Sequence, residues 1–251
     1  MKLEQFYFDV EETDIALTDP ERFKGNPIPG YKAIVTPVAD GQDKTIAVVK
    51  NTYKLVRNRE LIEPFLEQVD SLGVNWYIDE SHTFAALNRM RLQVTFPDLY
   101  LQDSESDIPL SLYLHNSYDM SEGIRVFWGA IRAICTNGMV MGHTLGKFYA
   151  RHTKGFDFEG INNQFSNATG KIEKLQRRIH FLESAALEEQ FMDEVQKALG
   201  KRRLKEITGT DVAPDKSKWQ LLNDITHHIS HHEEKPKRAD LQMKVSKVFD
   251  L

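Results

Sequence analysis

The sequence predicts an α+β protein: a mainly antiparallel sheet with hairpins that is packed by helices, followed by a C-terminal helical region. Two observations predict this class. Short runs with alternating apolar and polar residues fill the first half of the chain, and apolar residues recur every three or four positions after residue 160. The predicted parts are an N-terminal arm (1–30), an α+β core (31–160), a long helix (161–205), and a linker with C-terminal helices (206–251).

Composition limits the classes of function. The chain has 251 residues, of which 41% are hydrophobic and 27% charged, so it can bury a sizeable core. Its single cysteine, Cys135, excludes an internal disulfide. No signal peptide or membrane span is recognisable, and we expect a soluble protein in the cytoplasm of a bacterial host cell. The net charge of -5 excludes a wholly basic nucleic-acid coat, so any polyanion site would be a local patch.

The first elements of the predicted core are a hairpin and a helix. The N-terminal arm before them is acidic and punctuated by proline. Two β-rich runs, 31–38 and 44–56, flank the turn signal Asp40-Gly41. Residues 59–72 then have apolar positions at helical spacing and end at Gly73, which is typical of a helix C-terminus.

Residues 74–96 predict a second hairpin. Met90, Leu92, Val94 and Phe96 alternate with polar residues on its returning strand. This alternation places Arg89, Arg91, Gln93 and Thr95 on the opposite face. A loop is expected over 98–109, and a strand over 110–117 that presents Tyr113 and His115 on one side.

The next strand begins at Ile124. Unbroken alternation would separate Arg125 and Phe127 from Arg132, so we hypothesise a one-residue bulge at Gly129 that returns all three to one face. A plain strand break at Gly129 is the alternative. Residues 138–154 are predicted to form a helix packed on the sheet. Between residues 124 and 156 the chain contains no Asp or Glu.

Amphipathic helices are predicted for the rest of the chain. From Ile161 to Ala186 apolar residues follow the 4,3 spacing of a heptad seam. The seam would either pack on the sheet of its own chain, which we favour, or join protomers. A further helix is expected at 218–232.

No strong catalytic or cofactor motif is present. The paired spacing of His227 with His231 and of His228 with His232 could let two imidazoles hold a metal, but a third ligand is not evident. Cys135 is interpreted as a small core residue rather than a nucleophile. Because glycine-rich nucleotide loops and the Gly-x-Ser-x-Gly motif are absent, we expect no enzyme activity, no cofactor and no metal.

Cations and aromatic rings on the predicted sheet face favour nucleic-acid binding. Single strands are held by cations along a groove and by rings on which bases stack. The candidate residues are Arg89, Arg91, Tyr113, Arg125, Phe127, Arg132, Lys147, Tyr149 and Arg151. The alternative is a solvated sheet face whose arginines pair with the acidic N-terminal arm.

Three blocks of the sequence resemble a known family. They are "TIAVVKNTYKLVRNRELIEPFLEQVDSLG", "LHNSYDMSEGIRVFWGAIRAICTNGM" and "WQLLNDITHH". They are similar to the phage and plasmid-like family called domain of unknown function 932, over roughly residues 30–235. Its Arg-x-x-Cys-x-Asn block corresponds to Arg132, Cys135 and Asn137, and its late Asn-x-x-Thr pair to Asn223 and Thr226. This chain departs from the family's usual Asp-Gly-Ser turn, having Met120 in the place of the glycine.

What the resemblance implies is a protein of a phage or other mobile element. The order of its elements is also similar to that of phage single-strand annealing proteins of the RecT and Redβ class. These bind single-stranded DNA along a basic groove and oligomerise. We therefore expect a non-catalytic single-stranded DNA-binding or annealing protein that forms a homo-oligomer and does not bind membranes. A protein-binding inhibitor of a host defence system and a small metal-dependent enzyme using His227 and His231 are the alternatives.

Overall fold

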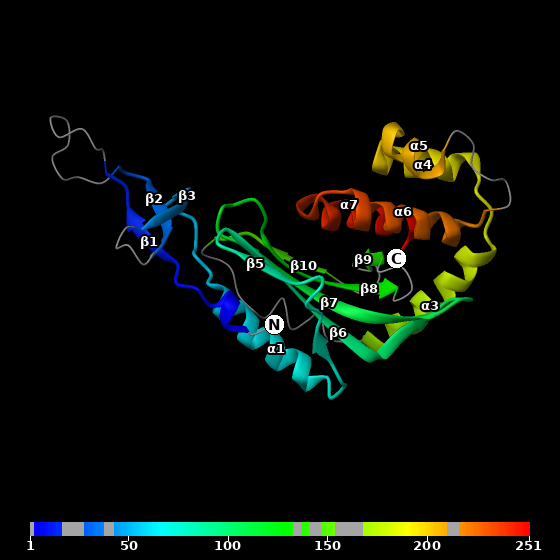
Figure 1. The fold of residues 1–251 in the computed structure, drawn as a ribbon, viewed down its shortest axis with the longest axis horizontal. Coiled ribbons are helices and arrows are strands. Elements are labelled where there is room, and N and C mark those ends of the chain that lie inside the picture. The colour runs from blue at the N-terminus through cyan, green and yellow to red at the C-terminus, as the bar shows by residue number, and fades with distance from the viewer. Residues whose placement is uncertain are drawn as a thin grey trace.

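The structure is a computed structural model that describes residues 3–16, 28–37, 43–132, 137–140, 147–153, 168–209 and 216–251. It contains a small and a large antiparallel sheet, with helices packed around the large one (Figure 1). The small sheet has the order β1-β2-β3, with β1 at Glu11–Asp14, β2 at Tyr31–Thr36 and β3 at Lys44–Lys50. The predicted α+β class is confirmed.

The large sheet has the order β10-β8-β7-β6-β4, with β5 paired to β6 and β9 paired to β8. Its long central strands are β6, β7 and β8, and every pairing is antiparallel. The strands are β4 (Tyr77–Ile78), β5 (Phe84–Ala86), β6 (Arg89–Gln102), β7 (Asp107–Ser117), β8 (Ile124–Arg132), β9 (Asn137–Val140) and β10 (Lys147–Ala150).

The helices lie on both sides of the large sheet. The helix α1 lies below it in Figure 1, whereas α6 and α7 lie above it. The helix α3 contacts both β6 and α6, and α4 packs against α7. The bounds are η1 (Leu3–Phe6), α1 (Asn58–Ser71), α3 (Ala168–Ser184), α4 (Glu189–Leu199), α5 (Lys201–Thr208), α6 (Lys218–His232) and α7 (Lys235–Phe249).

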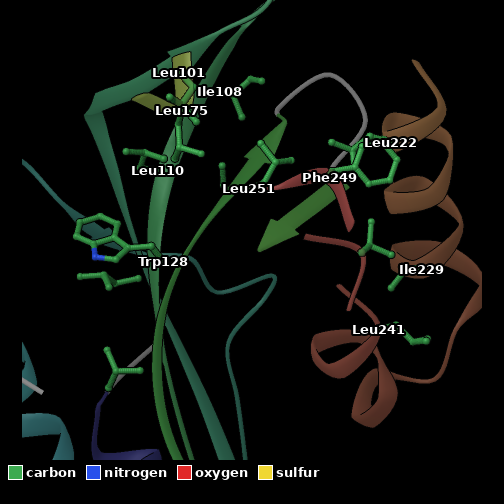
Figure 2. Packing of buried hydrophobic residues seen from close by; sticks show 14 of the residues in the cluster. Leu101, Ile108, Leu110, Trp128, Leu175, Leu222, Ile229, Leu241, Phe249 and Leu251 are labelled. Atoms are coloured by element: carbon green, nitrogen blue, oxygen red, sulfur yellow. The ribbon is translucent and has the colours of Figure 1, made fainter. Parts of the chain in front are cut away.

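Even-numbered residues of the central strands form most of the sheet's contribution to the main core, and Leu101 joins them after the irregularity in β6. The pattern follows from the two-residue period of a strand, which sends alternate side chains to opposite faces. The strand residues are fully or almost fully buried, and they join a cluster with α1, α3 and the C-terminal helices. Figure 2 shows Trp128 and Leu110 on the sheet and Phe249, Leu222 and Ile229 at the C-terminal helices. The buried residues of β6, β7 and β8 in this cluster are Met90, Leu92, Val94, Phe96, Leu101, Ile108, Leu110, Leu112, Leu114, Ile124, Val126, Trp128 and Ala130.

Several predicted elements are confirmed. The first hairpin is β2 and β3, the helix is α1, and the second hairpin is β4 with β6. The predicted helix at 218–232 is α6, which begins at Ser217 with a capping box: the Ser217 hydroxyl accepts from the backbone N–H of Gln220, and the Gln220 side chain accepts from the N–H of Ser217.

Three predictions near the large sheet are wrong. The helix predicted at 138–154 is replaced by the strands β9 and β10, which both pair with β8, so pairing at the sheet edge overrode the local helical pattern. The loop predicted at 98–109 is shorter, because β6 continues to Gln102 after an irregularity between Phe96 and Tyr100. There is no bulge at Gly129, and β8 pairs in an unbroken register from Ile124 to Arg132.

The continuous helix predicted for 161–205 is also wrong. Within its described part, α3 ends at Ser184, and α4 and α5 follow as separate helices. Two features divide them: an isolated bridge between Ala186 and Ser217, and Gly200, whose φ of 87° is unfavourable for other residues. Leu175, Ile179 and Leu182 are fully buried in the main core, so this part of the heptad seam packs within its own chain.

The N-terminal arm is partly integrated into the fold. Phe6 belongs to the main core, and Val10 belongs to a second, small cluster beneath the small sheet. The strand β1 pairs with β2, and Glu12 forms an ion pair with Lys32 at 2.7 Å. The acidic arm therefore neutralises a lysine of its own sheet. None of the helices in the described ranges has the length and apolarity that crossing a bilayer requires.

A buried hydrogen bond ties α6 to the large sheet. The indole Nε1 of Trp219 donates to Asp103 Oδ2 at 3.0 Å in the turn between β6 and β7, and both side chains are buried. The Asp103 carboxylate also accepts from the backbone N–H groups of Glu105 and Ser106. The same bond occurs in a solvent-exposed setting between Trp76 Nε1 and Asp70 Oδ1, at 2.8 Å.

We expect Trp219→Phe to lower the free energy of unfolding by about 1.5 to 3 kcal/mol, because it removes a buried hydrogen bond to a charged group. Trp76→Phe should cost about 1 kcal/mol or less, since water replaces the exposed bond. Urea denaturation of both variants and the wild type measures the difference. Equal losses would contradict the view that the buried bond anchors α6.

Candidate nucleic-acid interface

The odd-numbered residues of the central strands form a polar sheet face. The antiparallel register aligns Arg91 on β6 with His115 on β7, and His115 with Arg125 on β8. In the next row Gln93 aligns with Tyr113, and Tyr113 with Phe127. This register agrees with the prediction. It places Arg89, Arg91, Gln93 and Thr95 on one face of β6, and Tyr113 with His115 on one face of β7.

We expected this face to be open to water, but its centre is covered. Arg91 is 8% exposed and Phe127 is 1% exposed, because α6 and α7 cover the centre of the face. Tyr113 stacks on Phe127, with ring centroids 5.0 Å apart and an interplanar angle of 9°, and Met243 of α7 packs against this pair. Tyr113 and Phe127 thus act as a packing surface for α7.

A buried carboxylate neutralises the first row of this face. Glu122 Oε1 lies 2.6 Å from Arg91 Nη2 and 4.0 Å from Arg89 Nη1, and Glu122 Oε2 lies 3.3 Å from His115 Nδ1. Burial by itself would raise the pKa of the Glu122 carboxyl, but the His115 ring and the Arg91 guanidinium outweigh burial and lower it to about 2. Glu122 is therefore ionised at neutral pH and balances Arg91.

The turn before β8 holds Glu122 in place. The Ser117 hydroxyl donates to the Glu122 backbone oxygen at 2.7 Å and accepts from the Glu122 N–H at 3.1 Å. Met120 has a φ of 60°, in the left-handed region that favours glycine. Sequence reasoning missed Glu122; the only signal was a carboxylate in the turn that leads into the arginine-bearing strand.

Arg125 also has a carboxylate partner, but it stays accessible. Its Nη1 lies 2.6 Å from Asp240 Oδ1 of α7, and 19% of its side chain is exposed. Its guanidinium carbon also lies 5.8 Å from the ring centroid of Tyr149, the residue opposite it on β10. The alternative interpretation, in which the arginines pair with the acidic arm, is wrong for Arg91 and Arg125, whose partners are Glu122 and Asp240.

The open part of the site is at the edge of the sheet. Two adjoining hollows, of about 550 and about 410 Å³, share Arg125 and Tyr149. The larger extends to the small sheet, and the smaller extends to α7. We call them together the edge groove, and the residues used below are Tyr31, Lys50, Arg125, Lys147, Tyr149, Arg151 and Lys244.

The edge groove is locally cationic. Five Lys or Arg residues and two carboxylates line it, and those carboxylates, Glu122 and Asp240, are held by Arg91 and Arg125. Among the described residues, no carboxylate lies within the 4.0 Å ion-pair distance of the other four cations. These exposed cations are Lys50, Lys147, Arg151 and Lys244.

Exposed tyrosines line the same groove. Tyr149 is 56% exposed and Tyr31 is 45% exposed. The Tyr149 ring rests on Gly123, where an added Cβ would lie 2.6 Å from Tyr149 Cε2 and 2.5 Å from the Ala150 backbone oxygen. One face of the ring is thus supported by the backbone, and the side chain still offers surface to a ligand.

The two sheets meet beside this groove. Tyr53 forms an isolated bridge with Thr153 and stacks on His152, with ring centroids 4.9 Å apart. Burial lowers the pKa of His152, and its Nδ1 lies 3.2 Å from the Lys54 backbone oxygen. These contacts fix the small sheet, with Tyr31 and Lys50, relative to β10.

The structure brings together only some of the predicted site residues. Arg125, Lys147, Tyr149 and Arg151 line the edge groove, which Tyr31, Lys50 and Lys244 complete. Arg89, Arg91 and Tyr113 lie elsewhere on the polar sheet face, and Phe127 is buried at its border. Arg132 stands seven positions after Arg125 in an unbroken strand, so its register position is on the other face, and the shared face predicted for it is wrong.

In the described part of the chain, the histidine cluster does not form a metal site. The rings of His227 and His231 are 4.5 Å apart and those of His228 and His232 are 5.1 Å apart. Within the described ranges, no group of three or more His, Cys, Asp or Glu side chains is arranged to hold a metal ion. Cys135 lies outside the described residues.

Comparison with known proteins gives one match. A protein-family model described as a domain of unknown function (DUF932) matches residues 45–248. No curated protein and no solved structure matches the chain significantly.

The buried His115 makes stability depend on pH. Burial lowers the pKa of His115 to about 4, and the hydrogen bond to Glu122 offsets only part of this effect; Arg91 and Arg125 also disfavour the charged ring. The pKa of an unfolded histidine is about 6.5, so between that pH and about 4 the unfolded chain binds a proton that the folded chain does not. Falling pH therefore destabilises the fold through this group.

We expect the wild type to lose about 3 kcal/mol of unfolding free energy relative to His115→Gln as the pH falls from about 6.5 to about 4. Urea denaturation over this range measures the loss. His180→Gln is the matched control, because 63% of the His180 side chain is exposed. Parallel pH profiles for the wild type and His115→Gln would contradict the assignment.

Proposed function

The chain belongs to the DUF932 family, a domain of unknown function, and we propose that it binds single-stranded DNA in the edge groove and assists strand annealing without catalysis. The observation that carries the proposal is the combination of exposed tyrosines with cations that have no carboxylate partner in the described part of the chain. Proteins that hold single strands without reading sequence use this combination.

Charge supports a polyanion as the ligand. The whole protein carries a net charge of -5, so a groove with a surplus of cations is a local departure from the overall composition. Lys50 and Arg151 line the hollow near the small sheet, and Lys147 and Lys244 line the one near α7. Cations spread along a groove suit the repeated phosphates of a strand.

The aromatic residues favour a single strand over a duplex. Bases in a duplex are already stacked on one another, whereas bases of a single strand can stack on protein rings. Tyr149 stands where the two hollows meet, and Tyr31 stands in the larger one. A strand that follows the groove would pass both rings. The annealing role is an analogy that rests on the resemblance, drawn from the sequence, between the predicted order of elements and that of phage annealing proteins.

We expect the salt dependence of binding to show how many cations of the groove contact phosphates. For Arg151→Ala with Lys244→Ala, the slope of log K against log salt should become less steep by about 1.4, or about 0.7 for each lost phosphate contact. Fluorescence anisotropy with a labelled single strand of about 20 nucleotides, which exceeds a typical site size, measures the slope.

The matched control is Lys197→Ala with Lys201→Ala. This variant also removes two exposed cations, but they lie on α4 and α5 and do not line the groove. Its slope should equal that of the wild type. If the control flattens the slope as much as the groove variant does, binding depends on net charge and the edge groove is not the site.

Tyr149→Ala should weaken single-strand binding by about 5-fold to 150-fold, the equivalent of about 1 to 3 kcal/mol for a lost stack, without changing the salt slope. Tyr149→Phe, which keeps the ring, should bind like the wild type. The same anisotropy assay measures both variants, with duplex DNA as a comparison. Equal affinities for Tyr149→Ala and Tyr149→Phe would rule out stacking on this residue.

A further inference from the structure

A second, more enclosed pocket lies between the polar sheet face and the C-terminal helices. Its volume is about 340 Å³, within the range of small-ligand sites. Its floor is the row of Gln93, Tyr113 and Phe127 together with Arg91 and His115. One wall is the segment 81–84 before and within β5, and the roof comes from α6 and α7, with Arg238 among its residues.

The pocket favours an anion. Two arginines and three histidines line it, and no carboxylate is among its lining residues in the described part of the chain. Glu122 already balances Arg91, so Arg238 supplies the uncompensated charge. The carboxylates of Glu122 and Asp79 lie behind this lining, where they bind Arg91 and His82. The Arg238 Nε donates to a backbone oxygen, that of Glu233, at 2.9 Å. The positive charge of Arg238 is therefore available to a ligand.

Gln93, which lines this pocket, has a buried hydrogen-bond acceptor with no partner among the described residues. Gln93 has no exposed surface, and its Oε1 accepts no hydrogen bond from the described residues. Its Nε2 donates to the hydroxyl oxygens of Thr95 and Ser111, both at 3.2 Å, and to Asp79 Oδ2 at 3.5 Å. Because a carboxylate only accepts, the Asp79 contact fixes the orientation of the amide. An unsatisfied buried acceptor lowers stability, so a ligand that donates a hydrogen bond here would be favoured.

The walls of the pocket include flat rings. Phe84 and Phe127 both line it, and the Arg91 guanidinium lies 5.7 Å from the ring centroid of Phe84. Phe127 is held rigidly between the parallel ring of Tyr113 and the edge-on ring of His115. Rigid aromatic walls suit a planar, ring-shaped group.

From this cavity, its cations, the unpartnered Gln93 Oε1 and the aromatic walls, we infer that the pocket binds a single nucleotide. The base lies against Phe84 and Tyr113 and donates a hydrogen bond to Gln93, and the phosphate lies at Arg238. The nucleotide is either a free mononucleotide or the terminal nucleotide of a strand, because Phe127 also borders the edge groove.

Isothermal titration calorimetry of the full chain with adenosine monophosphate, adenosine and inorganic phosphate tests the inference. The monophosphate should bind, and adenosine and phosphate should each bind at least about tenfold more weakly, because each lacks one set of contacts. Phosphate binding as tightly as the monophosphate would reduce the site to a simple anion site and overturn the inference. Heat absent with all three ligands would also overturn it.

Two variants assign the binding to this pocket. Arg238→Ala should weaken the monophosphate by about 10-fold to 100-fold, as expected for a lost charge-assisted hydrogen bond, whereas Lys247→Ala on the same helix should not. Gln93→Leu removes the unpartnered acceptor at similar volume, so it should weaken binding. It also removes the Nε2 hydrogen bonds to Thr95 and Ser111, so its melting temperature is measured to confirm that the variant is folded at the titration temperature. Full binding by both pocket variants would contradict the inference.

Further measurements distinguish the two sources of the nucleotide. They also test the pocket independently of the edge groove. The variant Tyr149→Ala with Arg151→Ala should still bind the monophosphate, because neither residue lines the pocket. Displacement of a labelled single strand from the wild type by the monophosphate indicates a strand terminus, and no displacement indicates a free nucleotide. Monophosphate binding by a wild type that does not bind single strands would reject the proposed function and leave this inference standing.

Discussion

The antiparallel register that β6, β7 and β8 keep over their central rows is the constraint on which the rest of the structure depends. It pairs Arg89–Phe96 with Leu110–Ser117, and Leu110–His115 with Arg125–Ala130. It sends even-numbered residues such as Leu92 and Leu112 into the core and odd-numbered residues such as Gln93 and Tyr113 to the opposite face. A one-residue shift in any of these strands would exchange the two sets. Both the buried polar cluster and the pocket beneath α7 exist because three strands keep the same alternation.

Burying charged residues on this face requires compensation. Arg91 and His115 lie almost out of contact with water, and an isolated ion in that position would be strongly disfavoured. The structure meets this requirement with one carboxylate, Glu122, which bonds to both side chains. Because the pKa of Glu122 is lowered and that of His115 is also lowered, the cluster at neutral pH contains a carboxylate, a guanidinium and a neutral ring. Such an arrangement is balanced in charge, which allows α6 and α7 to cover it.

The two candidate binding regions differ in how they are exposed. At the edge groove, Tyr149 and Arg151 extend from the last strand of the sheet into open space. In the pocket, Gln93 and Phe127 are buried and reach only a small enclosed volume. A flexible polymer fits the first geometry and a compact ligand fits the second. The contact of both regions with Phe127 gives a physical route by which they could act on the same strand.

The sequence by itself determined the α+β class, the central strands, α1 and α6, and which residues alternate to the same face of β6 and β7. These features depend on local periodicity and capping, and the sequence records both directly. It also indicated Arg125, Lys147, Tyr149 and Arg151 as binding residues.

Only the tertiary structure decided which of the predicted residues are accessible. Arg91 and Phe127 are covered by α7, which is more than 100 residues further along the chain, and Arg91 is neutralised by Glu122 from a turn. The strands β9 and β10 replaced a predicted helix because β8 offered unpaired backbone groups at that edge. Long-range packing and pairing of this kind leave no periodic signal in a single sequence, so exposure and charge balance at the site could not be predicted from it.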